Sequence, residues 1–494
     1  MVLSTTSVAG VDVRHVDEVY VGGAWLPASG KVHQVVSPAT EEVVAEVGLP
    51  GVDQAAAAVT AAYDQGLSSW ARLPVTSRVA ACRRFCDALE TKLPDMGTVW
   101  AVEAGMPVRY SATLHRFGAV GAWTSALAHA EDALRPEHRG TPMGDVIVQH
   151  EPAGVVVGIM AYNGPLVTMA TKILPALLAG CPVVVKAAPE SQLIMRIVAE
   201  CAEAAGFPPG TLSLLAGDAE VGRALTADPR VDMVSLTGGH VAAQEIINAT
   251  RERFARTHLE LGGKSPALVL PDAPVEKVLR SLVPGATGGT GQVCALLTRV
   301  LVPESRHDEI VGAMAEAWSR LVIGNPLDPA THIGPLSNPA ARDRTERFVE
   351  RAVAEGGRII AGGRRPPGPE GGWWFEPTIV TDVARDSHLA RNEVFGPVTA
   401  VMTYTDIDDG IALANDTGYG LAATVYTTDR ERALYCADRI TAGSVALNSF
   451  GPSVAAPWGG RKGSGWGREG GPEGILEFTE TKQILVGPGL RGQA

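Results

Sequence analysis

Cys294 is the residue whose setting most clearly suggests covalent chemistry. It follows Thr290, Gly291, Gln292 and Val293. A cysteine just after a Gly-rich turn can expose its thiol beside free backbone N–H groups, which favours a nucleophilic thiolate. A lone cysteine is more often a small buried apolar side chain. Other segments of the chain must therefore decide between the two interpretations.

Asn163 and Glu260 are polar side chains in apolar surroundings. Asn163 lies in AYNGP at 161–165, directly after a β-branched run. Its amide either caps the following helix or donates a hydrogen bond to a group that becomes charged. Glu260 stands between two leucines in LELGGKSP at 259–266. The leucines favour partial burial over a surface position, and burial raises the pKa of a carboxyl group toward that of a general base.

Two further segments are ambiguous by themselves. EVFGPV at 393–398 holds an acid and an aromatic side chain on a tight turn, and alone it could be only a loop. A formal GxGxxG at 465–470 has no strand before it and no ribose-binding acid after it at the usual spacing. We therefore reject the second segment as a dinucleotide-binding motif.

Length and composition describe a multidomain globular protein. At 494 residues the chain is too long for one ordinary core, which predicts two or three domains. A net charge of −12 with no block of basic residues predicts no binding to nucleic acid or to an anionic membrane surface. The uncharged stretch at 152–171 is interrupted by Asn163, Pro165 and glycines, so it indicates a buried α/β core and not a membrane span. Six dispersed cysteines and a first segment without signal-peptide features predict reduced thiols and a cytoplasmic location.

Alternating strand-like and helix-like runs must position the candidate residues. In the middle of the chain, strands are predicted at 155–160, 182–186, 211–215 and 233–237, and helices at 166–178, 191–205 and 219–227. This alternation predicts βαβ units and a parallel sheet, and phosphate-bearing cofactors bind at the carboxyl ends of such strands.

A second α/β region is predicted after about residue 267. Its strands are predicted at 268–270, 299–303 and 445–448, and a long helix at 307–321. Short β-branched runs at 145–149 and 481–486 could form a small sheet that pairs with another subunit. The Pro/Gly run at 364–374 predicts a surface loop.

Taken together, these segments resemble the aldehyde dehydrogenase superfamily over nearly the whole chain. The matches are SPAT at 37–40, Asn163, Lys186, Glu260 in LELGGKSP, Cys294 in GQVC, EVFGPV at 393–398, Asn415 with YGLAA at 419–423, and PWGGRKGSGWGRE at 457–469. The resemblance implies the α/β aldehyde dehydrogenase fold. It implies a Rossmann-like parallel-sheet NAD(P)-binding domain at 1–125 and 151–261, an α/β catalytic domain at 262–470, and small β oligomerisation segments at 126–150 and 471–494.

The resemblance also implies catalytic roles, and it implies no metal. Cys294 would attack the aldehyde carbon, and the Asn163 amide with the Cys294 backbone N–H would stabilise the oxyanion. Glu260 would activate the water that hydrolyses the thioester. Lys172 would be an indirect partner near Asn163 or Glu260.

For the cofactor, the resemblance implies NAD, with NADP as an alternative. The implied cofactor-binding residues are Ala161, Tyr162, Lys186, Ala188, Glu190, Gly217, Gly238, Gly239, His240, Leu261, Gly262, Glu393 and Phe395. Three positions depart from the family pattern: Gly239 replaces the usual serine of the phosphate turn, Ala243 replaces a later glycine, and Pro189 replaces a glutamate. A backbone N–H at the helix start would then carry the diphosphate. His240 either faces the phosphates or is an exposed residue at the helix start.

Small residues around the nucleophile suggest a wide substrate channel, although they could equally serve close packing. The candidate substrate-binding residues are Gly164, Val167, Thr168, Thr171, Val293, Ala295, Phe450 and Trp458. If they line the channel, a bulky apolar aldehyde, long-chain, terpenoid or aromatic, is the expected substrate. A homodimer or homotetramer is expected.

Three other functions have to be weighed. A CoA-acylating semialdehyde dehydrogenase uses the same fold and cysteine, but it has no need of the hydrolytic base Glu260. A cofactor-independent thiol esterase would have no need of Lys186 or EVFGPV. A purely structural protein with this fold should have lost some of Asn163, Glu260 and Cys294, and all three are present.

Overall fold

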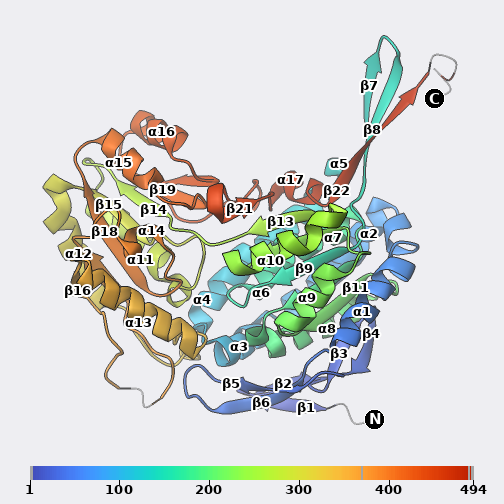
Figure 1. Cartoon of the computed structure of the whole chain (residues 1–494), viewed down its shortest axis with the longest axis horizontal. Coiled ribbons are helices and arrows are strands. Elements are labelled where there is room, and N and C mark those ends of the chain that lie inside the picture. The colour runs from blue at the N-terminus through green and yellow to red at the C-terminus, as the bar shows by residue number, and fades with distance from the viewer. Residues whose placement is uncertain (1–3, 369–370, 488–489, 491–494) are drawn as a thin grey trace.

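The chain folds into two α/β bodies with a β arm projecting from one of them (Figure 1). The computed structural model describes residues 4–368, 371–487 and 490. Within these residues no helix is long and apolar enough to span a bilayer. The two bodies meet along one face, and the candidate site lies where they meet.

The first body is built on a mostly parallel sheet. Its strand order is β21-β13-β12-β9-β10-β11-β3-β4. The bounds are Glu18–Val21 (β3), Ala24–Pro27 (β4), Val156–Met160 (β9), Val183–Ala187 (β10), Leu212–Ala216 (β11), Met233–Thr237 (β12), Arg256–Glu260 (β13) and Gly465–Trp466 (β21). The four predicted central strands, β9 to β12, are confirmed. The edge strands β3, β4 and β21, which are antiparallel to their neighbours, come from distant parts of the chain.

Helices cover both faces of this sheet, because successive side chains of a strand point to opposite sides. Val183 and Val185 pack with one layer of helices, and Val184 packs with the other. The first layer is Val75–Thr91 (α2), Leu93–Ala104 (α3), Gly121–Ala133 (α5), Leu174–Ala179 (α7) and Gln192–Ala205 (α8). The second layer is Val52–Ala61 (α1), Ala219–Ala227 (α9) and His240–Thr250 (α10). Burial on both faces explains why these strands are nearly continuous apolar runs.

The helix predicted at 166–178 is interrupted by a π turn. Pro165–Thr168 (α6) leads into the π-helical Met169–Ile173 (η4), and then into α7. A π turn rotates the residues that follow it and is common at functional sites. Here the turn contains Lys172, whose side chain is fully buried.

The second body has a sheet of order β16-β17-β18-β15-β14-β19-β20, parallel apart from β16. The strands are Pro266–Val269 (β14), Arg299–Pro303 (β15), Arg358–Ala361 (β16), Thr378–Thr381 (β17), Val398–Tyr404 (β18), Ala422–Tyr426 (β19) and Ser444–Leu447 (β20). The covering helices are Val275–Thr287 (α11), His307–Ser319 (α12), Pro339–Ala354 (α13), His388–Arg391 (α14), Ile407–Asn415 (α15) and Arg430–Arg439 (α16). The second α/β region and the helix predicted at 307–321 are thus confirmed.

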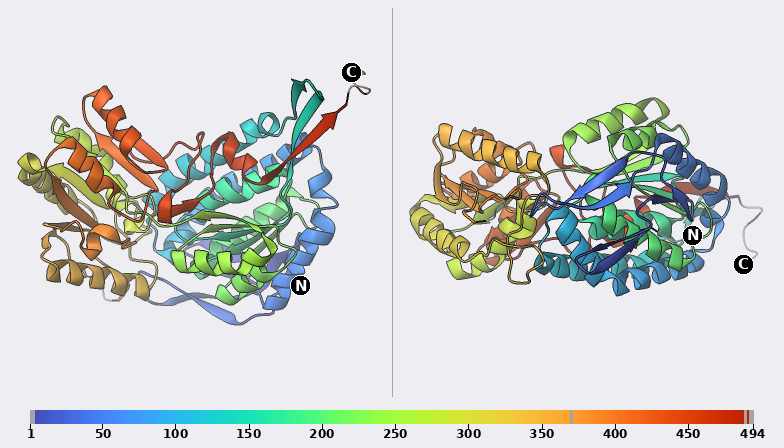
Figure 2. Two further views of the ribbon diagram at one scale, coloured as in Figure 1. Left: turned by 45° about the horizontal axis from the view of Figure 1, so that its top comes forward. Right: turned by 90° about the horizontal axis from the view of Figure 1, so that it is seen from below.

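The arm joins both predicted β-branched runs in one sheet. Glu137–Thr141 (β7), Gly144–Pro152 (β8) and Thr479–Val486 (β22) pair in the order β22-β8-β7. The left view of Figure 2 shows the arm standing clear of both bodies. The boundary expected between residues 125 and 126 falls inside the continuous helix α5, so the projecting part begins only after Ala133.

Candidate active site

Five strands of the first sheet end side by side, and most candidate residues follow these ends. Thr237 pairs with Glu260, Leu236 with Ile159, and Ala187 with Met160 and with Ala216. The chain order reverses between β9 and β12, and ligands of open parallel sheets bind at such a switch point. Asn163 follows β9, and Gly238 and Gly239 follow β12.

The nucleophile lies at the opposite, amino-terminal edge of the second sheet. Cys294 precedes β15, and the five residues between Glu260 and β14 cross directly from one sheet to the other. The carboxyl edge of one sheet therefore faces the amino edge of the other. This arrangement brings Cys294 and Glu260 together although 34 positions separate them in the sequence.

The turn before Cys294 has a backbone that glycine makes possible. Gly289 and Gly291 have φ values of 56° and 77°, and Thr290 between them is also left-handed at 57°. A Cβ at Gly291 would lie 2.2 Å from the carbonyl carbon of Gly396 in the EVFGPV turn. Thr290 is held in this unusual conformation by the Gly334 backbone N–H, which donates to its hydroxyl. The two Gly-containing turns are thus packed against each other.

Gln292 connects this turn to the end of β9. Its side-chain oxygen accepts hydrogen bonds from the Tyr162 hydroxyl at 2.9 Å and from the Ser337 backbone N–H at 3.0 Å. Its backbone carbonyl accepts from Asn163 Nδ2 at 2.9 Å. An amide carries two N–H donors, so this bond orients Asn163 and leaves its second N–H for another acceptor. Nothing in the sequence distinguishes Gln292 from the other polar residues near Cys294.

The Cys294 side chain is only partly exposed, and its surroundings oppose ionisation. Burial raises the pKa of the thiol above its usual range, and the carboxyl groups of Glu393, Glu260 and Glu469 raise it further. The surroundings of Cys294 therefore oppose the thiolate that a Gly-rich turn alone would favour, and burial contributes more to this effect than the three carboxyl groups do.

This environment predicts how the free thiol reacts. We expect the rate of Cys294 alkylation by iodoacetamide to rise about tenfold per unit from about pH 7 to about pH 9, because the thiolate fraction grows until the pH exceeds the pKa. Glu260→Gln removes one of the acids and should increase the rate. Mass spectrometry of the modified peptide gives the rate at each pH. A rate that stops rising below about pH 8 would contradict the raised pKa.

Glu260 ends β13 and is 4% exposed. Burial raises its pKa well above the usual range, and Glu469 raises it further, whereas Lys172 opposes the rise. Neither carboxylate oxygen makes a hydrogen bond of normal geometry within the described residues, although the Gly460 backbone N–H is close enough to oppose the rise in pKa. A Cβ at Gly459 would lie 2.9 Å from Glu260 Oε1, so the Gly-rich segment at 457–469 leaves room for this carboxylate.

Lys172 is ion-paired with Glu469 in the interior. Its Nζ lies 2.7 Å from Glu469 Oε1 and donates to Ser235 Oγ at 3.3 Å. The expected partners were Asn163 or Glu260, whereas the direct partner is Glu469. In the sequence, Glu469 stands out only as the last residue of PWGGRKGSGWGRE. A lone acid at the end of a Gly-rich run is the signal that could identify it.

The cofactor-side candidates lie along the strand ends of the first sheet. Lys186 is the buried, next-to-last residue of β10. Burial lowers its pKa, and the charges of Glu190 and Asp218 oppose this effect. Glu190 accepts a hydrogen bond from Asn338 Nδ2 at 3.1 Å. A Cβ at Gly239 would meet no atom within 4 Å, so the N-terminus of α10 is open to a ligand. The remaining candidates of this group at the strand ends are Ala161, Tyr162, Ala188, Gly217, Gly238, Leu261 and Gly262.

His240 is exposed at the start of α10 and also contacts the second body. Its Nε2 lies 2.5 Å from the Gly463 carbonyl oxygen, and its ring stacks on Tyr419 at 5.4 Å. The imidazole thus links the start of α10 to the Gly-rich segment.

The EVFGPV turn places Glu393 next to the end of β13. Glu393 Oε1 accepts from the Gly263 backbone N–H at 3.0 Å, and a Cβ at Gly262 would lie 2.2 Å from Glu393 Oε2. Burial raises the pKa of Glu393. Phe395 has a left-handed φ of 54° and meets the Tyr162 ring edge to face at 6.3 Å. The turn is therefore part of the site and not only a loop.

A cavity of 880 Å³ reaches Cys294, and its lining is mostly apolar. Six of the substrate-side candidates line it: Val167, Thr171, Val293, Ala295, Phe450 and Trp458. Gly164 and Thr168 are not among its lining residues; Gly164 caps α6, and the Thr168 hydroxyl bonds the Gly164 and Pro165 carbonyls within the helix. Helix positions not recognised in the sequence also line the cavity, among them Tyr110, Leu114, Phe117, Leu279 and Val283. Their apolar character alone does not distinguish them from core residues.

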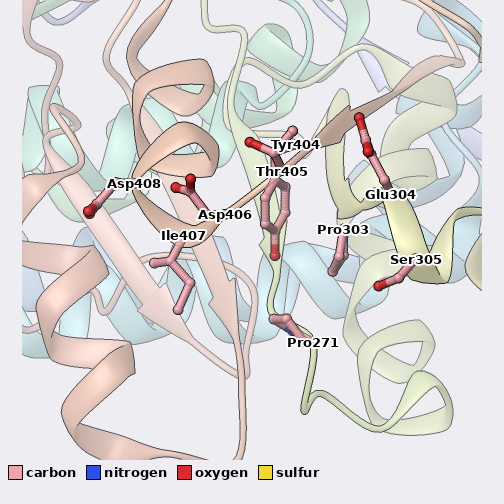
Figure 3. Close-up of a pocket in the computed structure, with 9 residues that line it drawn as sticks. All are labelled: Pro271, Pro303, Glu304, Ser305, Tyr404, Thr405, Asp406, Ile407 and Asp408. Carbon is pink, nitrogen blue, oxygen red and sulfur yellow. The ribbon is translucent and has the colours of Figure 1, made fainter.

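A second hollow, of 680 Å³, lies at the other end of the second sheet (Figure 3). It is lined by residues at the carboxyl ends of β14, β15 and β18, including Glu304, Tyr404 and Asp406. No nucleophilic cysteine lines it, and Cys294 precedes the amino end of β15. Among the described residues, no group of three or more His, Cys, Asp or Glu side chains could hold a metal ion.

Comparison with known proteins gives one consistent result. A model of the aldehyde dehydrogenase family matches residues 25–484. The chain is 37% identical to geranial dehydrogenase of Castellaniella defragrans over 96% of this chain and 99% of that protein. It is 35% identical to 3-succinoylsemialdehyde-pyridine dehydrogenase of a Pseudomonas species, again over 96% and 99%.

Solved structures agree in fold as well as in sequence. The Mycobacterium tuberculosis aldehyde dehydrogenase complexed with NAD+ superposes with a TM-score of 0.94 at 36% identity, over 99% of this chain and 100% of that chain. Betaine aldehyde dehydrogenase of Staphylococcus aureus gives 0.93 at 30% identity, over 97% and 96%. With the cysteine, the amide and the glutamate already assembled between two sheets, these matches establish that the chain belongs to the aldehyde dehydrogenase family.

Proposed function

We propose that this enzyme oxidises bulky apolar aldehydes, long-chain, terpenoid or aromatic, to carboxylic acids with NAD as the oxidant, through a covalent thioester on Cys294. The observation that carries the proposal is the 880 Å³ apolar cavity that reaches this thiol. The 37% identity to a geranial dehydrogenase supports a terpenoid-sized substrate.

The chemistry follows from the positions of three side chains. The Cys294 thiolate attacks the aldehyde carbon and forms a thiohemiacetal. The second Asn163 N–H and the Cys294 backbone N–H stabilise the oxyanion. Bound NAD supplies the acceptor for the hydride that leaves this carbon. Glu260 then removes a proton from water as the water attacks the thioester, and the carboxylic acid departs.

The residues at the strand ends fit a dinucleotide. The open N-terminus of α10 presents backbone N–H groups to a diphosphate, with Gly238 and Gly239 leaving space and His240 beside it. Lys186 would bind adenosine-ribose hydroxyls and Glu393 the nicotinamide ribose. We favour NAD over NADP because the Glu190 carboxylate, which acts on the Lys186 charge, would repel a 2′-phosphate. The NAD+ complex of the tuberculosis enzyme supports this choice.

The arm supports an oligomeric enzyme. β22 is an edge strand of the three-stranded sheet, and its side chains are mostly exposed. An open strand edge is a template for pairing with another chain. We propose a homodimer or homotetramer formed through this edge. Six free cysteines, five of them buried, support a reducing, cytoplasmic setting.

The substrate proposal predicts the order of specificity. In a panel followed by NADH absorbance, kcat/KM for geranial-sized and aromatic aldehydes should exceed that for acetaldehyde by at least about 100-fold, because each buried methylene contributes roughly tenfold. Val283→Trp narrows the cavity from α11. It should lower kcat/KM for the bulky aldehydes by about tenfold or more and leave acetaldehyde nearly unchanged.

Three results would reject parts of this proposal. Acetaldehyde as the best substrate would reject the bulky class. Stimulation of turnover by CoA would favour the CoA-acylating alternative, which the buried base Glu260 argues against. A higher kcat/KM with NADP than with NAD would reverse the cofactor preference.

A further inference from the structure

His258 is a fully buried histidine two residues before the general base. It is 0% exposed, and its Nε2 has no hydrogen-bond partner within the described residues. This nitrogen lies 4.0 Å from Glu260 Oε1, which also has no partner. A small side-chain rotation would join the two atoms, and catalytic hydrogen bonds are often long before substrate binds.

The other ring nitrogen connects to the buried ion pair. His258 Nδ1 lies 3.0 Å from Ser235 Oγ, and Ser235 Oγ lies 3.3 Å from Lys172 Nζ. Lys172 is in turn paired with Glu469 at 2.7 Å. Side chains from β12, β13 and η4 thus form a continuous line from Glu260 to Glu469.

The donors in this line can all point the same way. An ammonium only donates, so Ser235 Oγ accepts from Lys172 and its hydroxyl hydrogen is free to donate to His258 Nδ1. The ring proton then sits on Nε2 and faces the Glu260 carboxylate. When Glu260 is protonated, the opposite order places the ring proton on Nδ1 and the Nε2 lone pair toward the acid, and the serine hydroxyl can donate to Lys172 once Lys172 has passed a proton to Glu469.

We propose that His258 and Ser235 form a proton relay that returns the proton taken up by Glu260 to the Lys172–Glu469 pair. The proposal rests on the proposed function, in which Glu260 is the hydrolytic base. It makes His258 and Ser235 positioning residues for Glu260 that act after water has attacked the thioester.

The proton count balances along the line. Protonated Glu260 gives its proton to His258 Nε2, and Nδ1–H passes one to Ser235 Oγ. Lys172 first passes a proton to Glu469 and, as a neutral amine, then accepts the hydroxyl proton of Ser235, so that it is an ammonium again. Glu260 is ionised again and every intermediate group keeps its charge. Glu469 lines the substrate cavity, from which the proton can leave through water.

The surroundings keep the imidazole neutral, as a two-way relay requires. Burial lowers the pKa of His258, and the charges of Lys172, Arg468 and Arg256 lower it further. The acids facing it are Glu260 on its own strand and Glu469 beyond Lys172. The Phe478 ring meets the imidazole edge to face at 6.1 Å. Gly467 leaves room for the ring, since a Cβ there would lie 2.1 Å from His258 Cδ2.

The relay is tested by pre-steady-state kinetics of Ser235→Ala, His258→Gln and the double variant. Ser235→Ala removes one hydroxyl at nearly constant volume, and His258→Gln keeps a donor but cannot pass a proton in both directions. We expect the first NADH burst to persist and the later, steady rate to fall about tenfold to about a hundredfold in each variant. The apparent pKa of the acidic limb of kcat should rise, because Glu260 loses the group that stabilises its ionised form.

The design separates a relay from a structural effect. The double variant should be no slower than the slower single variant, because both substitutions cut one path. Ser213→Ala, at a buried serine on β11 whose hydroxyl accepts from the Gly22 backbone N–H, should keep wild-type kinetics. If His258→Gln does not fold, Ser235→Ala with its pH profile decides the matter.

The results that overturn the relay differ from those that overturn the proposed function. Wild-type burst, steady rate and pH profile in both single variants would reject the relay alone. Effects of Ser235→Ala and His258→Gln that multiply in the double variant would also reject it. A wild-type enzyme that never hydrolyses its acyl-enzyme would instead reject the proposed function.

Discussion

Cys294→Ala should lower kcat/KM for aldehyde oxidation by roughly 10⁴-fold or more, which is the scale seen when a covalent nucleophile is removed. The physical reason is that no other cysteine can replace it. Cys294 is the partly exposed thiol, whereas Cys82, Cys86, Cys181, Cys201 and Cys436 are buried. Initial rates of NADH formation with the best aldehyde of the panel measure the effect.

A matched control separates loss of the nucleophile from loss of any thiol. Cys201→Ala changes a buried cysteine on α8, remote from the cavity, and should keep the wild-type rate. Cys294→Ser keeps the shape but offers a much weaker nucleophile and should be nearly as inactive as the alanine variant. Retained oxidation by Cys294→Ala would mean that the thioester mechanism is wrong.

Glu260→Gln should slow steady turnover by about 10²- to 10⁴-fold, the usual contribution of a general base. Acyl-enzyme formation does not need this carboxylate in the proposed mechanism. A rapid burst of about one NADH per active site should therefore remain, followed by a very slow phase. Stopped-flow absorbance resolves the two phases, and mass spectrometry should detect the acyl group on Cys294.

The pH dependence gives an independent check of the same group. Because burial raises the pKa of Glu260, a larger share of it is protonated at neutral pH than of an ordinary glutamate. Turnover of the wild type should consequently increase with pH through the neutral range. In Glu260→Gln this increase of kcat with pH should vanish. Glu304→Gln, in the second hollow of Figure 3, should change neither the burst nor the pH profile. A normal steady rate in Glu260→Gln would remove Glu260 from the mechanism.

Much of the fold follows from local patterns. β9, β10, β11 and β12 are short, mostly apolar runs bounded by turns, and burial on both faces leaves a signal that the sequence shows directly. The pairing of β8 with β22 was also predictable from composition. The π turn η4 was not, because it is only five residues long and lies in a segment that is apolar on nearly every side, so no change of spacing can be recognised. The hairpin of β3 and β4 and the edge strand β21 were missed because these strands are short and the strands that they join, β11 and β13, lie far along the chain.

The residues of the candidate site also divide into those that the sequence reveals and those that only the structure reveals. The sequence by itself singled out Cys294, Glu260 and Asn163 as candidates, because a thiol after a Gly-rich turn and polar groups inside apolar runs are local anomalies with chemical meaning. It also determined the glycines that those turns need. Only the tertiary structure decided that Lys172 pairs with Glu469, that His258 and Ser235 lie between that pair and Glu260, and that acids surround the thiol. Electrostatic coupling depends on distance through space, and residues far apart in the sequence become neighbours only when the two sheets meet edge to edge.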